Sequence, residues 1–197
     1  VYKRQEDNLN FKEKAGKYID FLNVNAYDKE RDVRTNIAGE FQKSNLAAAL
    51  QTAELICGRL DEDKIYEALS QIRISGRMEE IAPGIIVDVS HNIQGMQGFV
   101  QTVEANYHGM KKRILFAASH QNEEEYMKNI LKTIPEIEAF YTVGIHKRRI
   151  DEAEFQDAFR KMIDRNQETT VCFVVGSFYL AGMAKEFINQ EEENVRL

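Results

Sequence analysis

The feature that most constrains this fold is a regular alternation of apolar runs and amphipathic segments from residue 84 onward. Short runs rich in apolar residues lie at 84–89, 113–119, 137–144 and 169–177. Segments with helical periodicity follow them at 96–107, 123–134, 151–166 and 180–190. Strands that are buried on both faces are nearly continuous in apolar residues. The alternation therefore predicts a doubly wound α/β fold, with a mostly parallel sheet and helices on both faces.

The first part of the chain does not share this alternation. Residues 18–24 are rich in β-forming side chains and predict a strand. Residues 44–60 predict a helix that Ser44 can cap, and a second helix is expected from Asp61 onward. Gly76 then interrupts the pattern. We therefore expect two units, 1–74 and 75–197, with the charged tail after 190 frayed.

The composition excludes several classes of protein. Of the 197 residues, 43% are hydrophobic and 29% are charged, which is an ordinary globular balance. The formal net charge of −6 disfavours nucleic-acid partners. No apolar run approaches the ~18 residues of a membrane-spanning helix, and we expect no signal peptide. Two distant cysteines make neither a disulfide framework nor a zinc site. We expect a cytoplasmic monomer without membrane partners.

Polar residues follow two of the predicted strands. Asp88 lies at the end of one apolar run, with His91 three positions later, and Gly176 and Ser177 end another. Open parallel sheets bind ligands at the carboxyl ends of their strands. Asp88 could accept hydrogen bonds from ribose hydroxyls, His91 could contact a ribose or a carboxylate, and a helix N-terminus near Ser177 attracts anions. The structural alternatives are an Asx turn after Asp88 and an N-cap at Ser177.

Several catalytic motifs are absent from the sequence. It contains no phosphate loop of the form G-x-x-x-x-G-K-[ST], no G-x-G-x-x-G fingerprint and no G-x-S-x-G elbow. No pair of histidines has metal-ligand spacing. We therefore expect no metal ligands within this chain, and any triphosphate would need a phosphate loop supplied from elsewhere.

Four segments together resemble the folylpolyglutamate synthase and dihydrofolate synthase family of the Mur ligase superfamily. GEFQKSNLAAAL at 39–50 is similar to a G-x-[HFY]-Q-x-x-N-x-x-x-A segment of the family's central domain. SGRMEEI at 75–81 resembles the G-R-[ML]-E segment that opens its C-terminal domain. IIVDVSHNIQGM at 85–96 and VVGSFYLAG at 174–182 resemble its D-[GAS]-[AS]-H-N-P and G-S-[LF]-Y-L segments. All four occur in family order.

The resemblance implies the C-terminal portion of an ATP-dependent ligase that adds L-glutamate to a folate or to dihydropteroate through an acyl phosphate. Residues 1–74 would end a Mur-type ATP-binding domain, and 75–197 would be the C-terminal ligase domain. Asn45 would contact the adenine, Arg77 the ATP phosphates, Asp88 and His91 the ribose and interdomain site, and Ser177 the glutamate. Arg77 and His91 would be catalytic. Mg²⁺ ligands would lie in a region N-terminal to this chain, which by itself would be inactive.

Two positions depart from the family pattern. Ile93 stands where the family has proline, and Gln121-Asn122-Glu123 stands where it has an acidic-Lys-acidic triplet. The second change removes a positive charge from a loop. Two other interpretations stay open. One is a fragment of a muramyl-peptide ligase, which shares the architecture, and the other is a non-catalytic remnant or interaction domain.

Overall fold

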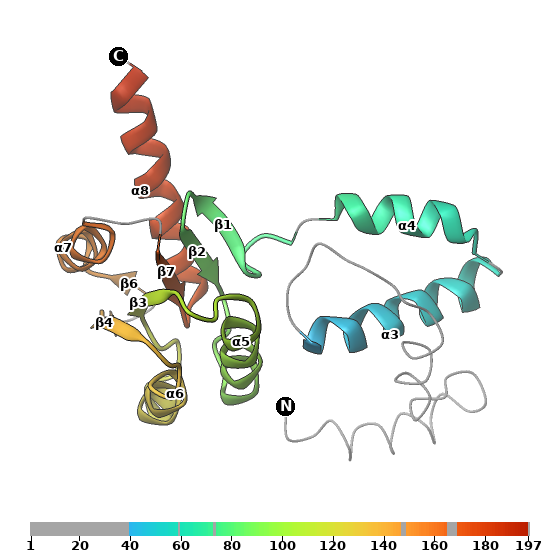
Figure 1. Ribbon diagram of the computed structural model, residues 1–197, viewed down its shortest axis with the longest axis horizontal. Helices are drawn as coiled ribbons and strands as arrows, with labels where there is room; N and C mark the ends of the chain where they lie inside the picture. Colours follow the sequence, from blue (N-terminus) through green and yellow to red (C-terminus); the bar gives the residue numbers. More distant parts are fainter. Residues whose placement is uncertain (1–39, 59, 73, 147–148, 165–168, 197) are drawn as a thin grey trace. The chain divides into compact units, whose positions relative to one another are not determined.

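The computed structural model describes residues 40–196, except for 59, 73, 147–148 and 165–168 (Figure 1). The chain divides into two compact units, Val1–Arg73 and Ile74–Leu197. The strand predicted at 18–24 lies outside the described residues. In the first unit, helix α3 spans Glu40–Cys57 and helix α4 spans Glu62–Gln71. Asp61 caps α4, because its side chain accepts hydrogen bonds from the backbone N–H groups of Asp63 and Lys64.

The second unit is built on a five-stranded sheet with the order β1-β2-β7-β3-β4. Its strands are β1 (Glu79–Ala82), β2 (Ile85–Asp88), β3 (Lys111–Phe116), β4 (Ile137–Thr142) and β7 (Thr170–Val175). The last four are parallel, and β1 pairs with β2 in the antiparallel sense. A short hairpin of β5 (Ile145–His146) and β6 (Arg149–Ile150) follows β4. The predicted α/β class with a mostly parallel sheet is confirmed.

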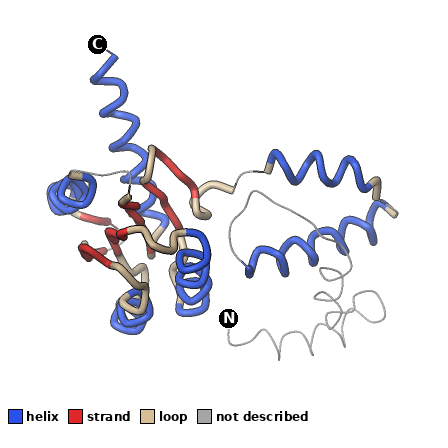
Figure 2. Tube along the Cα trace, viewed as in Figure 1, coloured by secondary structure: helices blue, strands red, loops and turns tan. Residues whose placement is uncertain are grey.

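Helices cover both faces of this sheet (Figures 1 and 2). Helices α5 (Ile93–Asn106) and α6 (Glu124–Leu131) pack on one face, and α7 (Glu152–Ile163) and α8 (Phe178–Arg196) pack on the other. The side chains of β7 alternate between the two cores, as the period of two in a strand requires. Phe173 joins the core under α5 and α6, while Cys172 and Val174 join the core under α7 and α8. The doubly wound prediction is therefore confirmed.

Helix boundaries differ from the sequence-based expectation at several places. Helix α3 begins at Glu40 rather than at 44, so Ser44 lies inside the helix and the cap predicted there is wrong. Helix α5 begins at Ile93 rather than near residue 96, because the Asn92 side chain accepts a hydrogen bond from the Gly95 N–H at 2.8 Å and caps the helix. Helix α8 continues to Arg196, so the predicted fraying after 190 is wrong. Glu191 contributes to this extension, since its carboxylate lies 3.6 Å from the Arg160 guanidinium of α7.

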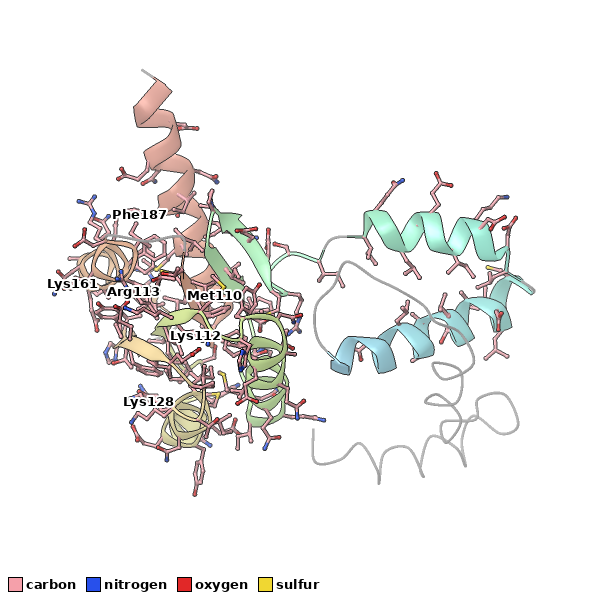
Figure 3. The ribbon with its side chains drawn as sticks, in the orientation of Figure 1. Met110, Lys112, Arg113, Lys128, Lys161 and Phe187 are labelled. Carbon is pink, nitrogen blue, oxygen red and sulfur yellow. The ribbon has the colours of Figure 1, made fainter. Side chains whose placement is uncertain are left out.

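Ion pairs close the amino end of the central strands. Lys112 of β3 is fully buried, and its Nζ lies 2.7 Å from Glu136 Oε2 (Figure 3). Arg113 pairs with Glu138 at 2.9 Å in the same region. A buried ammonium group without such a partner would be strongly destabilising. These ion pairs therefore contribute to the stability of the fold.

None of the helices in the described part of the chain combines the length and the apolar character that crossing a bilayer requires.

Candidate functional site at the carboxyl edge of the sheet

The strands β2, β7 and β3 end at the same level. Asp88 and Phe116 both lie opposite Val175, the last residue of β7. The loops after β2 and β3 lead to helices on one face, whereas the loop after β7 leads to α8 on the other. Adjacent loops that diverge in this way form the crevice in which open α/β sheets bind ligands. The sequence-predicted residues Asp88, His91 and Ser177 all lie at this edge.

Asp88 has a structural use that the sequence analysis named only as an alternative. It is 2% exposed, and its Oδ1 accepts a hydrogen bond from the Ser90 N–H at 2.8 Å. Its Oδ2 accepts the Met78 N–H at 3.0 Å. The first contact is the Asx turn, and the second ties the segment before β1 to the end of β2. The contact with a ribose stays a prediction, and little of the carboxylate faces solvent.

His91 is half-buried and has a defined tautomer. Its Nδ1 lies 2.9 Å from the carbonyl oxygen of Val89. A carbonyl oxygen can only accept, so Nδ1 carries the hydrogen and Nε2 is the nitrogen left for a ligand. The imidazole also lies 5.4 Å, centroid to centroid, from the ring of Phe178, the first residue of α8. His91 thus joins the loop after β2 to the helix that follows β7.

Ser177 caps α8, which is the structural alternative that the sequence offered. Its Oγ accepts a hydrogen bond from the Tyr179 N–H at 3.1 Å, and the side chain is buried. The hydroxyl hydrogen remains for donation, so the contact with a glutamate stays a prediction. The two residues after it were not singled out from the sequence. Phe178 and Tyr179 are 59% and 45% exposed at the same edge, and only their position after the Gly-Ser pair could have indicated them.

Arg77 and Asn45 lie on different units of the chain. Arg77 is half-buried in the turn before β1, where its backbone N–H donates to the Ile74 carbonyl at 3.2 Å. Its guanidinium forms no ion pair with any residue that the structure describes. Asn45 is exposed on α3 of the first unit. Their predicted contacts with phosphates and adenine stay predictions.

Two helix ends contribute to the electrostatic character of the edge. Both α5 and α8 begin there, and helix N-termini attract carboxylates and phosphates. Ile93 is the first residue of α5, a position that proline favours, so its replacement of the family's proline keeps the helix intact. Gln121–Glu123 form the short 3-10 helix η2 after β3, with Gln121 and Asn122 exposed. No group of three or more metal-ligating side chains gathers among the described residues.

Comparisons with known proteins agree with the resemblance predicted from sequence. No protein-family model matches the chain. The dihydrofolate synthase/folylpolyglutamate synthase of Bacillus subtilis is 23% identical over 109 residues, covering 52% of this chain and 25% of that protein. The folylpolyglutamate synthetase of Lactobacillus casei has a TM-score of 0.61 at 20% identity, covering 78% of this chain and 39% of its own.

Two further solved structures have the same fold. The FolC protein of E. coli, in complex with DHPP and ADP, has a TM-score of 0.62 at 17% identity, over 74% of this chain and 39% of its own. The folylpolyglutamate synthase of Thermotoga maritima has a TM-score of 0.59 at 21% identity, over 80% of this chain and 40% of its own. This chain therefore spans well under half the length of the proteins it matches. The resemblance to folylpolyglutamate and dihydrofolate synthases is confirmed.

Proposed function

We propose that this chain is the C-terminal part of an ATP-dependent ligase that joins L-glutamate to a folate-type acceptor. The observation that carries the proposal is that the D-x-x-H-N segment after β2 and the G-S segment after β7 lie at the same carboxyl edge. Asp88 pairs with Val175, the residue before the G-S segment, and Phe116 of β3 pairs with Val175 from the other side. Proteins similar to this chain in fold include a folylpolyglutamate synthase in complex with AMPPCP and folate. That likeness supports ATP and a folate as the ligands.

The two units would have different parts in this ligase. Residues 1–74 would complete an ATP-binding domain, where the Asn45 amide can both donate to and accept from the adenine edge. Residues 75–197 would form the C-terminal domain. Arg77 would reach the ATP phosphates, because its planar fork of donors matches phosphate geometry. Mg²⁺, which the resemblance implies, finds no ligand cluster among the described residues, so we assign it to no residue of this chain.

The reaction requires two displacements. An oxygen of the acceptor carboxylate attacks the γ-phosphorus of ATP, and ADP leaves. The amine of glutamate then attacks the carbonyl carbon of the acyl phosphate, phosphate leaves, and the amine loses a proton as the amide forms. Arg77 would stabilise the negative charge that spreads over the transferred phosphoryl group. His91 would present Nε2, because Nδ1 is committed to Val89, and Nε2 can accept a hydrogen bond from the amine.

The helix ends would hold the incoming glutamate. Its carboxylates carry the negative charge that the N-termini of α5 and α8 attract. The Ser177 hydroxyl still has its hydrogen to donate, because the Tyr179 N–H uses only a lone pair. Gln121-Asn122-Glu123, where the family has an acidic-Lys-acidic triplet, lacks the one cation that could assist. We therefore infer that the helix termini carry more of the glutamate affinity in this protein.

A ligation assay tests the proposal. The protein that contains these residues is incubated with ATP, radiolabelled L-glutamate and one of three acceptors: tetrahydrofolate, dihydropteroate or a nucleotide-linked muramyl peptide. We expect ATP-dependent label in a folate or pteroate product and none in the muramyl peptide. Label in the muramyl peptide alone would favour the muramyl-ligase interpretation. Absence of label in every product of the full-length protein would contradict the ligase proposal.

A further inference from the structure

An ion pair lies beside the turn that carries Arg77. The Nζ atom of Lys185, on α8, lies 2.5 Å from Glu79 Oε2 and 2.6 Å from Ser75 Oγ. The same Glu79 oxygen accepts the backbone N–H of Gly76 at 2.5 Å. The side chains of Lys185 and Glu79 are 28% and 33% exposed, so the pair is partly accessible to water. The contact joins α8 to a segment 110 residues earlier in the chain.

Both neighbours of Arg77 are held by carboxylates. The N–H of Gly76 donates to Glu79, and the N–H of Met78 donates to Asp88 at 3.0 Å. The carbonyl oxygen of Gly76 also accepts the N–H of Val89 at 2.8 Å. The direction in which Arg77 leaves the backbone is therefore set by contacts on either side of it.

The turn is strained, so these contacts are needed to maintain it. Glycine adopts positive φ readily, as Gly76 does at 72°, but Met78 has a φ of 45°. A left-handed conformation costs a side chain such as methionine about 1–3 kcal/mol, and it persists only where the surroundings determine it. Burial tends to raise the pKa of Glu79, but hydrogen bonds from Lys185 and Gly76 and the charge of Lys185 lower it overall. Glu79 is thus ionised at neutral pH and able to hold the turn.

We propose that Lys185 and Glu79 are positioning residues, whose ion pair holds the turn at 75–78 so that Arg77 reaches the transferred phosphoryl group. This inference rests on the proposed ligase function. Nζ of Lys185 already contacts Glu79 and Ser75, so the ammonium group acts on the turn rather than on a substrate. Small displacements of a catalytic cation matter, because a misplacement of about 1 Å can cost on the order of 10²-fold in rate.

The first test replaces Lys185 with methionine, which keeps the length of the side chain and removes its charge. Loss of a residue that orients a metal ligand typically costs about 10–100-fold in activity, and by analogy we expect a loss of this size here, chiefly in kcat. Lys185→Arg, which can keep the ion pair, should retain most of the rate. The matched control is Lys161→Met, because Lys161 of α7 pairs with Asp157 at 2.7 Å on an exposed surface (Figure 3). It should ligate normally.

A double mutant separates positioning from direct contact. If Lys185 acts through Arg77, the Lys185→Met change should cost little further activity once Arg77 is already alanine. Two losses that simply multiply would show that Lys185 acts independently of Arg77 and would overturn the inference. Glu79→Gln can be combined with Arg77→Ala in the same way, because glutamine keeps an acceptor for the Gly76 N–H and loses only the charge.

Amide hydrogen exchange measures the stability of the turn independently of the ligation assay. In Lys185→Met and Glu79→Gln, the N–H groups of Gly76 and Met78 should exchange faster than in the wild type and in Lys161→Met, while the amides of β7 stay protected. Unchanged exchange at Gly76 and Met78 would overturn the inference. A wild type that ligates but whose activity is insensitive to Lys185→Met would do the same and leave the ligase proposal intact. A full-length wild type that ligates no acceptor would contradict both the ligase proposal and this inference.

Discussion

Replacing Arg77 with alanine in the full-length ligase is expected to lower kcat/KM for glutamate ligation on the order of 10²-fold or more, as for other donors to a transition state. The stability of the protein should change little. The guanidinium is half-buried and forms no ion pair within the part of the chain that the structure describes, so its removal leaves no buried charge without a partner. We therefore expect the free energy of unfolding to change by only about 0.5 kcal/mol.

Steady-state kinetics measured beside a thermal melt check this expectation. Arg77→Lys keeps the charge but loses the planar fork, so its rate should lie between those of the wild type and the alanine variant. Arg160→Ala is the control for activity, because Arg160 of α7 is exposed and contacts Glu191 at 3.6 Å and the Phe187 ring at 5.3 Å rather than the turn that carries Arg77. Near-normal turnover by Arg77→Ala would contradict the assignment of Arg77 to the site.

Replacing Gly176 with alanine is expected to destabilise the second unit by about 3 kcal/mol, from a strained backbone and an overpacked contact together. The φ of Gly176 is 109°, a conformation that side chains rarely adopt. An added Cβ would lie 2.5 Å from the carbonyl oxygen of Ala117 and 2.7 Å from Cε2 of Phe116. The carbonyl belongs to the backbone of the neighbouring loop, which can yield only by moving the end of β3.

Urea unfolding of the alanine variant provides the measurement, and the chain offers a matched control. An added Cβ at Gly182, in α8, has no atom within 4 Å. Gly182→Ala should therefore stabilise the helix by about 0.5–1 kcal/mol. Equal unfolding midpoints for the two variants would contradict the close approach of the loops after β3 and β7.

Most of the fold could be predicted because its determinants are local in sequence. The apolar runs at 85–88 and 170–175 form buried strands, and their composition alone identifies them as strands, without knowledge of the neighbouring strands. The hairpin of β5 and β6 could not be predicted, since each of its strands has only 2 residues, too few to show a period. The extent of α8 was missed because a run of glutamates indicates a frayed end unless a partner such as Arg160 is known.

The candidate site was predictable in its membership but not in its contacts. The residues after β2 and β7 could be placed at one edge because the carboxyl ends of parallel strands meet there. The partner of Asp88 could not be foreseen, because the Met78 N–H lies 10 residues away and every residue but proline carries such a donor. The contact of Lys185 with Ser75 spans 110 residues. Only the folded chain brings such groups together.

The most direct test of this account measures whether an oxygen atom of the acceptor carboxylate is transferred to inorganic phosphate. The central claim is that ATP activates the acceptor carboxylate, in a ligase of which this chain is a part. The acceptor folate is prepared with both oxygens of its terminal carboxylate replaced by the heavy isotope, and the inorganic phosphate is analysed by mass spectrometry after ligation. Because a carboxylate oxygen attacks phosphorus and leaves with it, each amide formed should yield one phosphate carrying one heavy oxygen. Amide formation with unlabelled phosphate would contradict the account.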